Sequence, residues 1–310
     1  MKLEGIHHIT AITGDAVRNV EFYVGTLGLR LVKKTINQDD PTVYHFFYAD
    51  EDGSPGSDLT FFEYPHAAPG RAGAGMVHRI VWRVASSEAI DFWEQRLREE
   101  GVEARRDGDS LRFADPEGLE HELVVSTVPD KPLVSGAPDI PRELALQGFD
   151  GVRVYATNPA RSEALLRDTL GFTGGEGGRW EVRGDERGAL YIYDPPPADV
   201  RPRQGAGSVH HVAFATRMEE HELWHGRVRA AVPHATPIID RHWFRSIYFR
   251  EPSGVLFELA TIGPGFAVDE DPEHLGERLI LPPRFEHMRD RIERLLTPLP
   301  NPRAARRAAA

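Results

Sequence analysis

The sequence of 310 residues contains no cysteine. Disulfide bonds, thiolate metal sites and cysteine nucleophiles are therefore excluded, so any metal would have to be held by histidine, aspartate or glutamate. The sequence also lacks a run of about 20 apolar residues, which a membrane helix requires. The first residues, MKLEGIHHIT, lack the basic-then-apolar order of a secretion signal. We therefore expect a cytoplasmic protein.

The sequence has fewer basic than acidic side chains. The chain has 37 basic and 48 acidic side chains, so its formal net charge is 37 − 48 = −11. A negative surface opposes binding to phosphate backbones and to anionic membranes. We therefore expect neither nucleic acid nor a membrane as a partner, whereas a homo-oligomer is compatible with the sequence.

The chain contains four copies of one β-α-β-β-β unit, which we call modules 1 to 4. A repeat of this kind determines the fold, so it takes precedence over single motifs. The segments 22–28 and 165–171 share the same spacing from an apolar residue to the glycine that ends a helix. The phrases DPEGLEHEL (115–123) and EPSGVLFEL (251–259) align residue for residue. The first strands of the four modules are expected at 5–13, 77–84, 150–157 and 209–216.

The predicted fold class is α+β, with four βαβββ modules that form two paired-repeat, cup-like β-sheet halves. We expect an N-terminal domain over 1–126 with modules 1 and 2, and a C-terminal domain over 148–262 with modules 3 and 4. The proline-rich segment 127–147 reads as the linker between them. A C-terminal tail with a helix follows over 263–310.

Two histidines and one glutamate are the candidate metal ligands. His8 and His211 occupy the same position in the first strands of modules 1 and 4. Glu258 lies in the last strand of module 4, between Phe257 and Leu259, and a carboxylate in so apolar a strand needs a partner. Two neutral imidazoles and a carboxylate fill one side of an octahedron and leave the rest open. This arrangement suits Fe(II), and Mn(II) fits it as well.

The other two modules serve as an internal control. Module 3 has Gly151 at the position of His8, and module 2 has Arg79 at the position of His211. Glu122 aligns with Glu258, so we expect an ion pair between Glu122 and Arg79 where a metal would otherwise lie. The sequence therefore predicts one metal per chain. For the ligands to converge, modules 1 and 4 must build one cup, and modules 2 and 3 the other.

Four segments resemble the vicinal-oxygen-chelate superfamily, which includes glyoxalases, bleomycin resistance proteins and dioxygenases. They are GIHHIT (5–10), SVHHVAFAT (208–216), DRHWFRSIYFREPSGVLFELAT (240–261) and the tail phrase PGF…LILPP (264–283). Within the superfamily they are most similar to the ring-cleaving dioxygenases that act on hydroquinones. The likeness spans nearly the whole chain.

The resemblance implies an Fe(II)-dependent, extradiol-type ring-cleaving dioxygenase with a small hydroquinone-like or catechol-like aromatic substrate and dioxygen. Mn(II) is a second choice of metal, and Zn or Ni fit less well. The resemblance also implies five catalytic residues around the substrate: His7, Thr10, His210, Arg241 and Tyr248.

Strict strand alternation conflicts with two of these assignments, because it turns His7 and His210 away from the metal face. Their role would require strand twist or a site at the strand edge. Aromatic walls for the substrate are expected from four side chains: Phe214, Trp243, Phe244 and Phe257.

Two other functions stay open. The first is a metal-dependent glyoxalase, lyase or thiol transferase of the same superfamily. Glyoxalases commonly take a carboxylate from each of two modules, and module 1 aligns Phe61 near the Glu258 position, which weakens this alternative. The second is a non-catalytic module that binds small molecules, against which the retention of all three ligands argues.

Overall fold

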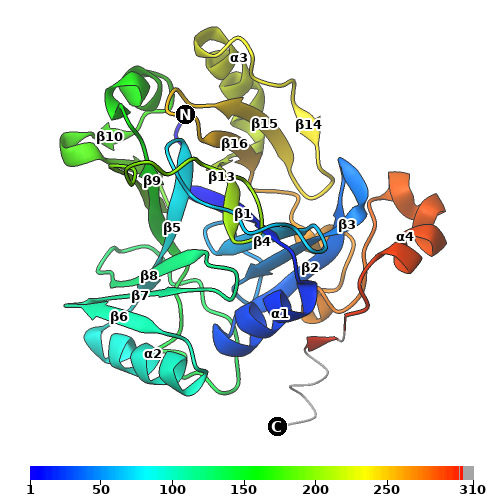
Figure 1. Ribbon diagram of the computed structural model, residues 1–310. Helices are drawn as coiled ribbons and strands as arrows, with labels where there is room; N and C mark the ends of the chain where they lie inside the picture. The colour runs from blue at the N-terminus through cyan, green and yellow to red at the C-terminus, as the bar shows by residue number, and fades with distance from the viewer. Residues whose placement is uncertain (300, 303–310) are drawn as a thin grey trace.

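The strands of modules 1 and 4 form one curled sheet, which we call the first cup (Figure 1). The computed structural model describes residues 1–299, 301 and 302. Module 1 supplies β1 (Ile6–Thr13), β2 (Arg30–Asn37), β3 (Asp40–Ala49) and β4 (Asp58–Glu63). Module 4 supplies β13 (Ser208–Thr216), β14 (Ile239–Asp240), β15 (Arg245–Arg250) and β16 (Leu256–Thr261). The strand order is β14-β15-β16-β13-β1-β4-β3-β2.

Modules 2 and 3 form the second sheet, the second cup. Module 2 supplies β5 (Met76–Val84), β6 (Ala104–Asp107), β7 (Ser110–Ala114) and β8 (Glu120–Val125). Module 3 supplies β9 (Phe149–Tyr155), β10 (Thr173–Gly174), β11 (Arg179–Arg183) and β12 (Gly188–Asp194). The order is β10-β11-β12-β9-β5-β8-β7-β6, which confirms the predicted pairing of modules. The domain boundaries at 126 and 148 stay a prediction, because each half of the chain supplies strands to both sheets.

Each module places its helical segment after its first strand. Modules 2 and 4 have the α-helices α2 (Ser87–Glu99) and α3 (His221–Ala231), the latter preceded by η5 (Met218–Glu220). Modules 1 and 3 have shorter helical segments that end in a π-helical turn. In module 1 these are α1 (Ala16–Val20) and the π-helix η1 (Glu21–Thr26), and in module 3 the 3₁₀ segment η2 (Pro159–Ser162) and the π-helix η3 (Leu165–Thr169). Gly28 and Gly171 follow with φ of 70° and 76°, a conformation that glycine adopts without strain. The aligned glycines therefore end equivalent turns.

Short helical segments complete the chain, and the tail closes against module 1. The remaining 3₁₀ segments are η4 (Glu176–Gly178), η6 (Phe266–Val268), η7 (Pro272–His274) and η8 (Pro283–Met288). The predicted tail helix is α4 (Arg289–Leu295), which contacts β3 and buries Ile292. Among the described residues, no helix is long and apolar enough to cross a bilayer.

A bulge in each central strand explains how paired histidines share a face. Strands β1 and β13 lie antiparallel at the centre of the first cup, and the pairing register shifts by one residue at His7 and again at His210. A bulge re-aims the side chains next to it, so strict alternation no longer applies. The second cup has the same shifts at His78 and Asp150. The bulges therefore belong to the repeat itself.

Candidate active site

His8, His211 and Glu258 meet at the centre of the first cup, on the neighbouring strands β1, β13 and β16. The Nε2 atoms of the two histidines lie 3.2 Å apart. Oε2 of Glu258 lies 3.2 Å from Nε2 of His8 and 3.0 Å from Nε2 of His211. Three donor atoms on one octahedral ion, with bonds of about 2.1 Å at right angles, lie about 3.0 Å apart. The triangle therefore has the size that one metal ion requires.

The three side chains are almost inaccessible to solvent, with exposed fractions of 4% or less. Burial acts to raise the pKa of Glu258, but the imidazoles of His8 and His211 outweigh it and hold that pKa well below its usual range. Burial lowers the pKa of His211, although Glu258 opposes the shift. An ionised carboxylate and a neutral imidazole are the forms that bind metal. Oε2 of Glu258 is buried without a hydrogen bond from any described residue, so these donors fit a metal ion.

The histidines at the bulges, His7 and His210, contact the ligand rings on the side away from the triangle. Nδ1 of His8 lies 2.9 Å from Nδ1 of His7, and His7 Nε2–H donates to the carbonyl of Thr261 at 3.1 Å. Burial lowers the pKa of His7 to about 3, so its ring is neutral and Nδ1 must accept the proton of His8 Nδ1. This leaves the Nε2 lone pair of His8 directed at the triangle. Nδ1 of His210 makes the same contact with His211 at 2.8 Å.

Glu258 has a fixed partner as well, and the second cup repeats it. Ser246 donates to Oε1 of Glu258 at 2.5 Å. Ser110 donates to Oε1 of Glu122 at 2.9 Å from the equivalent strand position. In both cups a serine two residues along the neighbouring strand therefore orients the carboxylate. This contact leaves Oε2 of Glu258 for the triangle.

The second cup replaces the two histidines. Nη1 of Arg79 lies 3.2 Å from Oε2 of Glu122, which confirms the predicted ion pair. At the position of His8 stands Gly151, where a Cβ atom would lie 2.2 Å from the backbone oxygen of Leu190. No side chain fits there without movement of the backbone. The second cup has kept the carboxylate but not the imidazoles.

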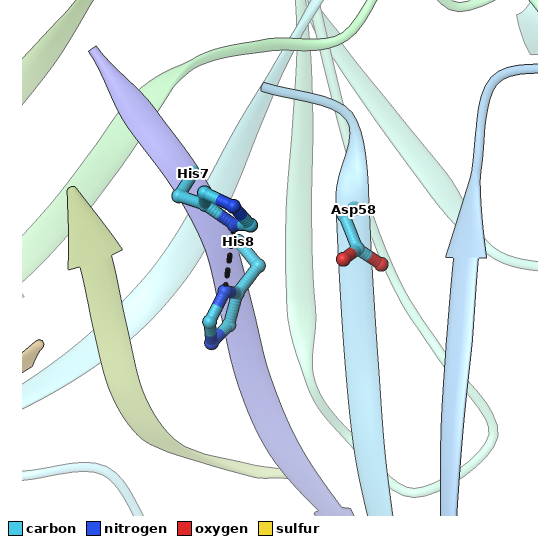
Figure 2. A group of neighbouring side chains, drawn as sticks. All are labelled: His7, His8 and Asp58. Carbon is cyan, nitrogen blue, oxygen red and sulfur yellow. Dashed lines mark hydrogen bonds between the residues drawn. The ribbon is translucent and has the colours of Figure 1, made fainter. Parts of the chain in front are cut away.

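A second cluster lies behind the first. Figure 2 shows Asp58, on β4, beside the contact between His7 and His8. Its two carboxylate oxygens are buried without hydrogen bonds from the described residues. Burial, with a smaller effect of Asp50, raises the pKa of Asp58 well above its usual value, so the carboxyl group is neutral and a poor ligand. Because Nδ1 of His8 is already engaged by His7, the triangle with Glu258 is the better metal site.

A small pocket borders the triangle, with His8 and His211 in its wall. Its volume is about 30 Å³. A cavity of about 150 Å³ accommodates benzene, so an aromatic ring requires this pocket to open. Its apolar wall is formed by four aromatic side chains: Phe47, Phe62, Trp243 and Phe244. Phe214 and Phe257, which were expected in this wall, lie in the main core instead.

A polar bridge, which we call the latch, joins Gln38 and Asp39 to Arg241 over this pocket. Nη1 and Nη2 of Arg241 donate to the two carboxylate oxygens of Asp39 at 3.0 and 2.8 Å. Nε2 of Gln38 donates to the carbonyl of Arg241 at 2.7 Å. The Asp39 side chain is 71% exposed, against 13% for Arg241. The latch therefore spans modules 1 and 4 at the outer end of the pocket.

The loop that carries Arg241 is anchored more firmly on its other side. Trp243 Nε1 donates to Oδ2 of Asp269 in the tail at 2.9 Å. Lys33 Nζ, which is fully buried, donates to Oδ1 of Asp269 at 2.8 Å. A buried pair is costly to separate, whereas an exposed pair contributes little. The Asp39 side is therefore the one that can open.

The remaining residues implied by the resemblance lie at different distances from the pocket. Arg241 and Tyr248 line it, whereas His7 and His210 lie behind the ligands. Thr10 is fully buried, and its hydroxyl contacts that of Thr60 at 2.7 Å. Thr10 therefore does not face the substrate space directly.

The pairing register corrects one alignment. Thr10 pairs with Thr60 two residues after His8, just as Ala213 pairs with Glu258 two residues after His211. Thr60, not Phe61, therefore stands at the Glu258 position of module 1. Phe61 points into the main core, as its apolar side chain requires.

Sequence reasoning missed Asp39 and His45, which line the pocket, and Ser246, which holds Glu258. A signal existed for His45, because Tyr44, Phe46 and Tyr48 alternate on the core face of β3 and leave His45 on the other. Asp39 had no local signal, since its partner is 202 residues away.

Comparison with known proteins agrees with this geometry. The family model "Glyoxalase/Bleomycin resistance protein/Dioxygenase superfamily" matches residues 5–123. The Bacillus subtilis protein named "Putative ring-cleaving dioxygenase MhqA" is 41% identical over 96% of this chain and all of its own length. The chain belongs to this superfamily.

Other relatives extend the comparison. Chlorohydroquinone/hydroquinone 1,2-dioxygenase of Sphingobium indicum is 32% identical over 95% of this chain and 96% of its own. A crystal structure from Bacillus subtilis, described as a putative dioxygenase, has a TM-score of 0.89 and 37% identity over 96% of this chain and 98% of its own. Glyoxalase I from Zea mays shares the fold, with a TM-score of 0.57 and 15% identity over 83% and 92%.

These relatives confirm the expected fold and an enzyme of the ring-cleaving dioxygenase class, an oxidoreductase that incorporates dioxygen. A dioxygenase of this superfamily requires a metal cofactor, and the donor triangle of the first cup fits one.

Proposed function

We propose that the first cup is the active site of an Fe(II)-dependent, extradiol-type dioxygenase that cleaves the ring of a hydroquinone-like or catechol-like aromatic. The donor triangle carries this proposal: three buried ligand atoms 3.0–3.2 Å apart, with their outer atoms held by neighbours. His8, His211 and Glu258 would hold the metal. Two imidazoles and one carboxylate suit Fe(II) that must keep positions open. When bound, Fe(II) would acidify the substrate hydroxyl and activate dioxygen.

The neighbouring residues have separate roles in this proposal. His7, His210 and Ser246 act as positioning residues, because each holds the outer atom of one ligand. Such contacts set ligand orientation and basicity.

Two pocket residues would contact the substrate. Arg241 lies with its guanidinium 5.4 Å from the centre of the Tyr248 ring. Burial raises the pKa of Tyr248, so its hydroxyl stays protonated and donates a hydrogen bond. Arg241 supplies positive charge where a substrate oxygen becomes negative. Aromatic walls keep water from the reacting ring.

The small aromatic substrate is supported by the character of the pocket and by one relative. Four aromatic side chains form its apolar wall. The relative from Sphingobium indicum is named for chlorohydroquinone and hydroquinone. A substrate of this kind and dioxygen are the partners that we propose.

The presence of Thr60 argues against the glyoxalase alternative. A second carboxylate would have to come from the Glu258 position of module 1, and Thr60 occupies it. A purely binding module has no use for three convergent buried ligands.

The test is oxygen uptake by anaerobically purified, Fe(II)-loaded protein given a panel of hydroquinones and catechols. We expect one dioxygen consumed for each hydroquinone lost. Single-metal binding without uptake, together with turnover of thiol adducts under nitrogen, would favour the lyase or transferase alternative instead.

A further inference from the structure

His45 presents a polar group to the substrate pocket that the proposed chemistry has not used. It lies on β3, lines the pocket, and is neither a metal ligand nor a neighbour of one in the sequence. Its ring is held between Phe47 and Phe62, with centroid distances of 4.0 and 4.4 Å. The two aromatic neighbours restrict the rotation of the imidazole, so its nitrogens have fixed directions.

One nitrogen of His45 belongs to a chain of buried hydroxyl groups. Nε2 lies 2.9 Å from Oγ1 of Thr60, which lies 2.7 Å from Oγ1 of Thr10. Both threonines are fully buried. The other nitrogen, Nδ1, makes no hydrogen bond to any described residue, and the ring borders the pocket.

The buried end of this series of hydrogen bonds determines which group donates and which accepts at each step. Within the described part of the chain, the Thr10 hydroxyl has Thr60 as its hydrogen-bond partner. A buried hydroxyl proton needs an acceptor, so Thr10 donates to Thr60, and Thr60 in turn donates to Nε2 of His45. A neutral imidazole that accepts at Nε2 carries its proton on Nδ1. Burial lowers the pKa of His45 well below its ordinary value, which agrees with a neutral ring.

The repeat shows that this contact has a set place in the fold. His45 pairs with the residue two positions after Thr60, as Ser246 pairs with the residue two positions after Glu258. At that place Ser246 donates to Glu258, and Ser110 donates to Glu122. In module 1 the same place holds the pair His45–Thr60. The contact that orients a carboxylate in modules 2 and 4 therefore orients the imidazole of His45 in module 1.

We propose that His45 is a specificity-determining residue whose Nδ1–H donates a hydrogen bond to the ring oxygen of the substrate that the metal does not take. Thr60 and Thr10 act as positioning residues that hold the donor tautomer. The inference rests on the proposed function, because it assumes an aromatic substrate bound through one oxygen. The expected consequence is tighter binding of a ring with two oxygen substituents than of a ring with one.

Two substitutions distinguish the contribution of Nδ1 of His45 from that of Nε2. In His45→Asn the side-chain amide lies near the Nδ1 position, so it keeps a donor in the pocket. In His45→Gln the amide reaches the Nε2 position, so it keeps the contact with Thr60 but loses the pocket donor. Anaerobic titration calorimetry of the Fe(II)-loaded variants would compare hydroquinone with phenol.

We expect His45→Gln to bind hydroquinone about tenfold more weakly than the wild type and to bind phenol unchanged, because one hydrogen bond is lost. His45→Asn should keep most of the preference for hydroquinone. Equal binding by the two variants would overturn the proposal, as would a wild type that binds both rings equally. Metal content measured on each sample shows whether the triangle is intact.

A second measurement is independent of turnover. In ¹⁵N-histidine-labelled, Zn(II)-loaded protein, the ring nitrogen shifts of His45 should report a proton on Nδ1. Thr60→Val should move that proton to Nε2. A wild-type ring protonated on Nε2 would overturn the proposal even if the enzyme cleaves hydroquinone. A correct tautomer in a protein without oxygen uptake would instead refute the proposed function, and with it the assignment of a substrate oxygen to His45.

Discussion

The first and second cups are built on the same strands, bulges and serine–carboxylate pairs, yet they hold different chemistry. In the first cup, two imidazoles and Glu258 surround a point that no cationic side chain of the described residues occupies. In the second cup, Arg79 takes the place of one imidazole and neutralises Glu122, while Gly151 takes the place of the other. A carboxylate in this fold therefore needs a cation, and the cups differ in whether the protein supplies it.

The cups also differ in how they are closed. The pocket of the first cup has a volume of about 30 Å³ beneath the latch. The second cup has a cavity of about 570 Å³ whose walls include several arginine and acidic side chains. A dry, closed site strengthens electrostatic interactions, whereas an open one is screened by water. The two cups therefore differ in how far they are closed as well as in their ligands.

Replacing the carboxylate should have the largest effect, and in one cup only. Glu258→Gln removes a charged ligand, so we expect metal content and oxygen uptake to fall together by at least a hundredfold. Glu122→Gln should keep one metal per chain and lower stability at most, by about 1–3 kcal/mol. Metal analysis and thermal unfolding of both variants provide the measurement. Equal metal loss from the two would show that the cups are not different in the way described.

Tyr248→Phe should keep the metal and slow turnover by roughly a hundredfold, because a hydrogen-bond donor to the substrate is lost. The second cup has Arg112 at the equivalent position, so the role that we propose for Tyr248 is specific to the first cup. Tyr44→Phe is the matched control, since its hydroxyl donates to the carbonyl of Thr297 away from the pocket. Steady-state kinetics would decide, and unchanged kinetics would remove Tyr248 from the mechanism.

Weakening the latch should have a smaller effect, about tenfold, on access to the site. Asp39→Asn removes the ionic partner of Arg241, so chelators should extract the metal faster. The hydrogen bond from Arg241 holds the pKa of Asp39 below the ordinary value of an aspartate. The wild-type latch is therefore complete above that ordinary value and is lost as the pH falls through the lowered pKa.

The control for the latch is Asp40→Asn, because Asp40 accepts hydrogen bonds from Thr42 and not from Arg241. Its metal should leave at the wild-type rate at neutral pH. If Asp39→Asn and Asp40→Asn release metal at the same rate, Asp39 does not control access.

The smallest effect is expected where a ligand is restored to the second cup. Arg79→His should leave the metal content at one per chain, since Gly151 cannot carry the other imidazole beside the backbone of Leu190. Plasma emission spectroscopy on the purified variant would measure it. A second equivalent of metal would show that the ion pair alone had kept the second cup empty.

Alignment of the repeats was enough to predict the module pairing and the Arg79–Glu122 ion pair. Matches several residues long fix which residue of one module is equivalent to which residue of another. It failed by one residue in module 1, where Thr60 and not Phe61 stands opposite Glu258. A slip of one residue exchanges the two faces of a strand. The rule that a fully apolar side chain faces the core would have corrected the alignment.

Other features depend on contacts that no local pattern encodes. The bulges at His7 and His210 overrode strict alternation and resolved the conflict over these two residues. The latch joins residues that are far apart in the chain. Such features arise when two modules meet, and single-sequence periodicity describes each module separately.

The most direct test of the account is anomalous diffraction at the iron edge from crystals of Fe(II)-loaded protein. We predict one peak, within bonding distance of His8, His211 and Glu258, and none near Arg79 and Glu122. A peak in the second cup, or one between His7, His8 and Asp58 in place of the first, would contradict it.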